Sequence, residues 1–190
     1  MARPTNPEIR ELLREKAIDY VLKEGIADLS LRPLAKALRT NARMLVYHFG
    51  SREGLMRDIL AGLREREDAR IRGWFKTAKK PVSLSDFLRW YWRRLSAPRA
   101  RSAVLLIFEL YALALRDPEA YGGVLTDPIA YWQKLVENAG VATRANAAEA
   151  TLLLAATRGL LLDLAATNDR TRLTKTVSLL AGLLESPAEN

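Results

Sequence analysis

The chain has 190 residues, of which 49% are hydrophobic and 27% are charged, and it can bury about 70% of its unfolded surface in one or two compact units. It contains no Cys and one His, which excludes disulfides and the common His and Cys metal sites. No glycine-rich phosphate loop is present either. We therefore expect no enzyme, no catalytic residues, no metal and no cofactor.

The net charge of +8 is concentrated in the first part of the chain. Residues 1–80 hold 18 Lys and Arg against 11 Asp and Glu, an excess of +7, whereas residues 81–190 hold 12 against 11, an excess of +1. This asymmetry is expected if the first part meets a polyanion, although solvated helical faces produce the same excess.

The hydropathy pattern shows neither a signal peptide nor a membrane span, and this bears on the cellular location. The first residues have no apolar signal-peptide core, and no run reaches the roughly 18 apolar residues of a membrane span. We expect a cytoplasmic protein without a membrane segment, and the lack of Cys fits a reducing compartment.

The chain begins with a helix, because Asn6 and Pro7 form a cap and first turn, and apolar residues then recur at helical intervals up to Gly25. The stretch 30–55 follows, SLRPLAKALRTNARMLVYHFGSREGL. Its apolar spacing predicts two short helices separated by Arg39-Thr40-Asn41, and Ser51 caps a third helix. Two short helices joined by a tight turn form a helix-turn-helix, whose second helix can enter a DNA major groove.

This stretch resembles the TetR-like transcriptional regulators. Leu34-Ala35 corresponds to the family's apolar-Ala pair, and residues 45–55, LVYHFGSREGL, correspond to its Leu-Tyr-x-His-Phe-x-Ser-Lys-Glu-x-Leu tail. Three positions depart from the pattern: Arg39 replaces the turn glycine, Arg43 replaces a small residue, and Val46 replaces a phosphate-contacting Tyr, with Tyr47 one place later. These departures affect individual contacts and leave the class unchanged.

Several residues around the second short helix suit DNA. Arg43 can bind guanine bidentately, Asn41 can do the same to adenine, and Thr40 and Tyr47 suit phosphates. Met44, Leu45 and Phe49 are expected to point inward, and His48 to pack between helices or bond a phosphate. The candidate DNA-binding residues are Arg32, Lys36, Thr40, Asn41, Arg43, Tyr47, His48 and Arg52.

The rest of the chain reads as successive helices. A connector helix is predicted at 51–75, a break at 76–83, and further helices at 85–96, 102–116, 127–139, 147–167 and 173–184. We expect an all-α protein with an N-terminal three-helix helix-turn-helix DNA-binding domain at 1–52 and a C-terminal helical ligand-binding and dimerisation domain at 76–190.

The C-terminal part resembles the family's effector-binding and dimerisation domain. Its rings can form the walls of an apolar or aromatic ligand site with Glu109 as the polar group, or they can simply fill a core. The candidate ligand-binding residues are Phe87, Trp90, Tyr91, Phe108, Glu109, Tyr111 and Trp132.

The Leu-rich helix at 147–167 is more apolar than one packing face requires, which predicts a homodimer through 147–167 and 173–184. Arg158 and Asp163 within it are interpreted as a structural pair.

The resemblance implies a homodimeric repressor that leaves a near-palindromic DNA operator when a small effector binds. Two alternatives stay open. One is a nucleic-acid-binding or helical interaction module without sequence preference or effector, and the other is a constitutive repressor that has lost its ligand.

Overall fold

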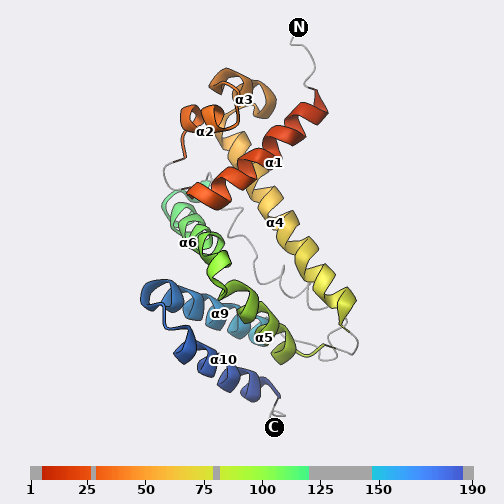
Figure 1. The fold of residues 1–190 in the computed structure, drawn as a ribbon, viewed down its shortest axis with the longest axis vertical. Coiled ribbons are helices and arrows are strands. Elements are labelled where there is room, and N and C mark those ends of the chain that lie inside the picture. Colours follow the sequence, from red (N-terminus) through yellow and green to blue (C-terminus); the bar gives the residue numbers. More distant parts are fainter. Residues whose placement is uncertain (1–5, 27–28, 79–81, 120–146, 186–190) are drawn as a thin grey trace. The chain divides into compact units, whose positions relative to one another are not determined.

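The structure is a computed structural model that describes residues 6–26, 29–78, 82–119 and 147–185. The regular elements in these ranges are helices, which confirms the all-α class. The helix expected at 127–139 lies outside the described residues. The elements are α1 (Pro7–Glu24), α2 (Leu31–Ala37), α3 (Ala42–Phe49), α4 (Arg52–Thr77), α5 (Leu84–Leu95), a 3-10 turn (Pro98–Ala100), α6 (Arg101–Arg116), α9 (Ala147–Thr167) and α10 (Arg170–Glu185) (Figure 1).

The chain forms two compact units that do not simply follow the predicted boundary at residue 76. The N-terminal unit comprises Met1–Ile71 with Leu105–Leu125, and the C-terminal unit comprises Arg72–Val104 with Thr126–Asn190. The long helix α4 therefore contributes to both units, and so does α6.

The core of the N-terminal unit joins α1, α2, α3, α4 and α6. Its fully buried members include Ile18 and Val21 of α1, Leu34 of α2, Leu45 of α3 and Ile59 of α4, each at 0% exposure. Two residues of α6, Leu106 and Ala114, belong to the same cluster. The helix-turn-helix is thus packed against a helix that the sequence assigned wholly to the other domain.

Helix α1 crosses α4 in this unit, as Figure 1 shows. The crossing is close at Gly62, where an added Cβ would lie 2.2 Å from Cδ1 of Ile18. Ion pairs flank it: Arg14 to Glu65 at 2.7 Å, and Arg66 to Glu15 at 2.5 Å and to Asp19 at 2.7 Å. Desolvation opposes the charge of Arg66, but the bonds to the two carboxylates outweigh it and raise the pKa of Arg66.

In the C-terminal unit, α5 packs against α9 and α10. A capping box between Ser83 and Asp86 fixes the start of α5. Trp92 on its buried face donates from Nε1 to Oγ1 of Thr174 on α10 at 3.0 Å. Glu185, at the end of α10, accepts from Arg89 at 2.7 Å. These bonds hold the two helices together along much of their length.

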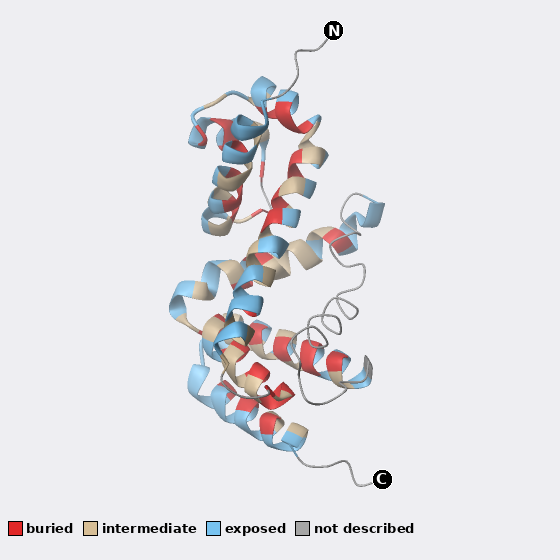
Figure 2. Cartoon of the chain, turned by 90° about the vertical axis from the view of Figure 1, so that its right-hand side faces the viewer, coloured by how far each residue is buried: buried red, intermediate tan, exposed pale blue. Residues whose placement is uncertain are grey.

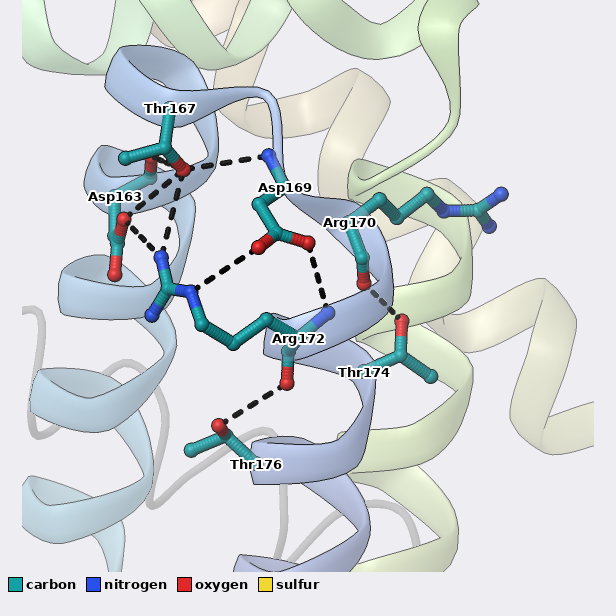
Figure 3. A network of polar contacts seen from close by, with 7 residues as sticks. All are labelled: Asp163, Thr167, Asp169, Arg170, Arg172, Thr174 and Thr176. Atoms are coloured by element: carbon teal, nitrogen blue, oxygen red, sulfur yellow. Dashed lines mark hydrogen bonds and ion pairs between the residues drawn. The ribbon is translucent and has the colours of Figure 1, made fainter.

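The turn between α9 and α10 is fixed by Arg172, which lies between two carboxylates in Figure 3. It donates to Asp163 at 2.7 Å and pairs with Asp169 at 3.4 Å. The bond from Arg172 lowers the pKa of Asp163. Asp163 therefore pairs with Arg172 of its own chain, whereas Arg158 is half-buried near Tyr91.

Helices α9 and α10 each expose some apolar residues and bury others. Figure 2 shows buried and exposed residues alternating along α10, the helix that ends near the C-terminus. Leu152 and Leu162 of α9 are 51% and 54% exposed, and Leu179 and Leu183 of α10 are 67% and 66% exposed. The segment Ala148–Thr167 is long and apolar enough to span a bilayer by length and composition, and 33% of its most apolar stretch is buried inside the protein. A single helix of this kind is weak support for a membrane segment.

Candidate nucleic-acid interface

The turn between α2 and α3 closes with a left-handed residue, as in the family pattern, although that residue is not glycine. Arg39 adopts a φ of 56°. The backbone N–H of Thr40 then donates to the carbonyl of Ala35 at 2.9 Å, and the N–H of Arg39 to that of Lys36 at 3.2 Å. A left-handed conformation costs about 1–2 kcal/mol in a non-glycine residue, so packing elsewhere compensates for it.

Helix α3 begins at an Asn cap and buries one face. The Oδ1 atom of Asn41 accepts from the N–H of Met44 at 2.9 Å, which satisfies a donor of the first turn. Leu45, His48 and Phe49 are buried at 0%, 6% and 8% exposure. The inward face therefore holds α3 rigidly against the core.

The opposite face of α3 is open to solvent. Arg43 is exposed, and Met44, Val46 and Tyr47 are exposed by 37%, 40% and 38%. The expectation that Met44 points inward was wrong, because the helix rotates it to the side of Arg43. Met and Val offer apolar surface of the kind that contacts a thymine methyl group. The exposed face combines a guanidinium, a phenol and apolar side chains.

The candidate DNA-binding residues divide between this surface and the interior. Arg32 and Lys36 are exposed on α2, Thr40 and Asn41 lie on the turn, and Arg43 and Tyr47 lie on α3. These six residues belong to one continuous segment that presents cationic and hydrogen-bonding groups. His48 and Arg52 are placed differently.

The ring of His48 packs inside the N-terminal unit. Both ring nitrogens are shielded from solvent, and within the described part of the chain neither has a hydrogen-bond partner. Its backbone carbonyl accepts from Nε of Arg10 at 3.3 Å, and the Arg10 guanidinium lies 5.3 Å from the Phe49 ring centroid and pairs with Asp58. This geometry agrees with the packing interpretation of His48. Arg10, which the sequence did not single out, supports the end of α3.

Arg52, in the first turn of α4, is half-buried and faces the protein. Its Nη2 donates to the carbonyl of Leu29 at 3.0 Å, just before α2. It therefore holds the polypeptide that leads into the helix-turn-helix. Nearby, Ser51 caps α4 as expected, since its Oγ accepts from the N–H of Gly54 at 3.0 Å.

The candidate ligand-binding residues fall into separate groups. Phe87, Trp90 and Tyr91 of α5 lie in the C-terminal unit, where Phe87 and Tyr91 stack with centroids 5.5 Å apart. Trp74, at the end of α4, stacks on Trp90 at 4.6 Å. It is an aromatic partner that the sequence did not single out, and its place in a charged connector helix hid it.

The other candidates lie elsewhere. Phe108, Glu109 and Tyr111 are half-buried residues of the α6 segment that belongs to the N-terminal unit. Glu109 accepts a hydrogen bond from the backbone N–H of Ile26 at 2.7 Å. Trp132 lies outside the described residues.

The N-terminal unit contains a helix-turn-helix: a short helix, a tight turn, and a second helix with a buried face and an exposed cationic face.

No family model and no curated protein matches the chain. Solved structures match it over most of its length.

The multidrug binding protein EbrR, complexed with imidazole, matches at 27% identity and a TM-score of 0.68, covering 96% of this chain and 93% of that one. The transcriptional regulator SCO7518 of Streptomyces coelicolor matches at 23% identity and a TM-score of 0.69, with 92% and 99% covered. A protein assigned to the TetR family from a Rhodococcus species matches at 21% identity and 0.63, with 92% and 98% covered. The chain has the fold of the TetR-family transcriptional regulators, which confirms the resemblance found in its sequence.

Proposed function

We propose that the protein is a homodimeric, sequence-specific DNA-binding regulator, acting as a repressor that a small apolar or aromatic effector releases from a near-palindromic operator. The observation that carries the proposal is the two-sided character of α3. Leu45, His48 and Phe49 anchor the helix, while Arg43 and Tyr47 stay exposed beside the cationic α2. A rigid helix that presents such groups fits the major groove.

The exposed residues have separate roles in this proposal. Arg43 reads a base edge, and the amide nitrogen of Asn41, whose oxygen caps α3, stays available as a donor. Lys36, Arg32, Thr40 and Tyr47 contact phosphates and set the register of the helix on the duplex. Affinity for any DNA then depends mainly on the cations, whereas sequence preference depends on Arg43 and its apolar neighbours.

The homodimer is supported by the exposed face of α9. Solvent-exposed residues with small or apolar side chains recur at alternating intervals of four and three: Ala148, Leu152, Ala155, Gly159, Leu162 and Ala166. This spacing forms one stripe along a helix and suits a second helix packed against it. A bilayer would surround α9 on all sides, and it would then have to accommodate the charges of Arg158 and Asp163, which are half-buried on the other sides of the helix. A second copy of the chain would cover only the exposed stripe, so it is the better partner.

The effector is supported by the aromatic cluster of the C-terminal unit. Trp74 stacks on Trp90 and Phe87 stacks on Tyr91, while Trp74 and Phe87 are tilted with centroids 5.8 Å apart. The Arg94 guanidinium lies 5.3 Å from the Tyr91 centroid. EbrR, which shares this fold, is described in complexes with imidazole and with proflavin. A planar apolar or aromatic molecule suits such walls.

Selection of bound duplexes from a random pool tests the proposal. We expect a near-palindrome bound at least about 10³-fold more tightly than a scrambled duplex at the same salt concentration. Recovery of no preferred sequence, together with equal affinity for both duplexes, would favour the non-specific module. A compound panel then separates an inducible from a constitutive repressor, because a true ligand raises the Tm of the protein and weakens operator binding.

A further inference from the structure

Ile26 and Leu29, two described residues between α1 and α2, are each held by a side chain from a helix that is distant in sequence. At its beginning, the backbone N–H of Ile26 donates to Oε2 of Glu109 on α6 at 2.7 Å. At its end, the carbonyl of Leu29 accepts from Nη2 of Arg52 on α4 at 3.0 Å. The N–H of Leu29 also donates to the carbonyl of Ile26 at 3.1 Å. Helix α2 therefore starts from a fixed position.

The hydrogen bond from Ile26 to Glu109 depends on the absence of a side chain at Gly25, the residue before Ile26. Gly25 has φ 86° and ψ −176°, a region that is essentially restricted to glycine. An added Cβ at Gly25 would lie 3.0 Å from both carboxylate oxygens of Glu109. The carboxylate thus sits directly over the end of α1, where a side chain would displace it.

Helix α6 is itself anchored beside this contact. Leu106 and Ala114 are 3% and 2% exposed and belong to the core that also contains Leu34 of α2 and Leu45 of α3. Ile26 is 1% exposed, so its N–H has no access to bulk water as a substitute partner. A charged acceptor makes one of the stronger kinds of hydrogen bond to such a donor.

We infer that Glu109 is a positioning residue for DNA reading: its carboxylate, carried by α6, fixes the start of α2 and thereby the presentation of the α2–α3 pair. The inference rests on the proposed function, and it gives Glu109 a role at the helix-turn-helix in place of an effector contact. When the bond is lost, only a fraction of molecules holds the geometry that the operator requires, and the apparent Kd for the operator rises in inverse proportion to that fraction. Binding to unrelated DNA depends on net positive charge and changes less.

Three variants of Glu109 separate the bond from the charge. Glu109→Ala removes both, Glu109→Gln removes the charge but keeps an oxygen that can accept the N–H, and Glu109→Asp keeps the charge on a side chain one methylene shorter. Each is compared with the wild-type protein for its Kd on the selected near-palindrome and on a scrambled duplex at one salt concentration. Hydrogen exchange at the Ile26 amide reports the bond directly.

We expect Glu109→Ala to lower the ratio of operator to scrambled affinity by about tenfold or more, and to accelerate exchange at Ile26, while Glu109→Gln stays close to wild type. If Glu109→Ala does not fold, Glu109→Asp carries the test, because it should show the same loss with the charge intact. An unchanged affinity ratio in the folded variant would overturn the inference, as would equal losses in the Ala and Gln variants. Failure of the wild-type protein to prefer any duplex would instead overturn the proposed function.

Discussion

The crossing of α1 and α4 at Gly62 makes a prediction whose sign can be worked out from the structure. Replacing a helix-interior Gly by Ala normally stabilises a helix by about 1 kcal/mol. At Gly62, however, the new Cβ would lie 2.2 Å from Cδ1 of Ile18, which is 0% exposed and cannot move into solvent. Overpacking of this kind costs about 1–3 kcal/mol, so Gly62→Ala should be destabilising by up to about 2 kcal/mol.

The same helix supplies a matched control. Gly73 is exposed, and a Cβ added there meets no described residue within 4 Å, so Gly73→Ala should keep the full gain of about 1 kcal/mol. A change of 1 kcal/mol shifts the Tm of a chain of this size by roughly 2–4 °C. Thermal unfolding followed by circular dichroism should therefore show opposite shifts for the two substitutions.

A double mutant tests the cause of the difference. Ile18→Val removes the clashing Cδ1 and alone costs about 0.5–1.5 kcal/mol. In the presence of Ile18→Val, Gly62→Ala should become much less destabilising, giving a favourable coupling between the two sites. Equal stabilisation by Gly62→Ala and Gly73→Ala in the wild-type background would refute the close crossing.

Three further predictions concern DNA, the dimer and pH. Arg43→Ala should cost about 1–3 kcal/mol on the selected operator and relax preference at one position, whereas Lys36→Ala should weaken all duplexes alike in parallel titrations; equal losses on operator and scrambled duplexes would remove Arg43 from base readout. Gly159 is exposed, and a Cβ added there meets nothing within 4 Å among the described residues, so Gly159→Leu should leave the Tm at high dilution nearly unchanged but shift sedimentation toward monomer, and an intact dimer would exclude α9 from the interface. Arg172 lowers the pKa of Asp163, so this bond contributes stability above the ordinary Asp pKa of about 3.9 and loses it as the pH falls through the lower folded value. The Tm difference between wild type and Arg172→Met should accordingly be largest near neutral pH and shrink below about pH 4, and a pH-independent difference would contradict the ion pair.

Local patterns were sufficient for the helices of the described ranges and for the identity of the helix-turn-helix. Asn6, Asn41 and Ser51 cap helices as expected, because a cap depends on neighbours within the same turn. Ser30 occupies the cap position of α2 but makes no side-chain cap bond. Arg39, at the turn, takes a left-handed conformation for which glycine would have been the local choice.

Long-range contacts were not readable from the sequence. Periodicity placed Met44 inside, since the few residues of a short helix define its rotation poorly. Glu109 appeared as a lone polar residue in an apolar helix, and nothing local linked it to Ile26, 83 residues away. Arg52 looked like a phosphate ligand by composition, yet the carbonyl of Leu29 lies within its reach. For Glu109 and Arg52 the partner is distant in sequence and leaves no spacing signal.

The central claim is that the exposed face of α3 is presented to DNA in two copies. Hydroxyl-radical and base-methylation footprints of the selected duplex test it most directly. We predict two protected major-groove patches centred about 10 base pairs apart, or a multiple of that spacing, related by the symmetry of the sequence and weakened together by Arg43→Ala. A single protected patch, or uniform protection that Arg43→Ala leaves unchanged, would contradict the account.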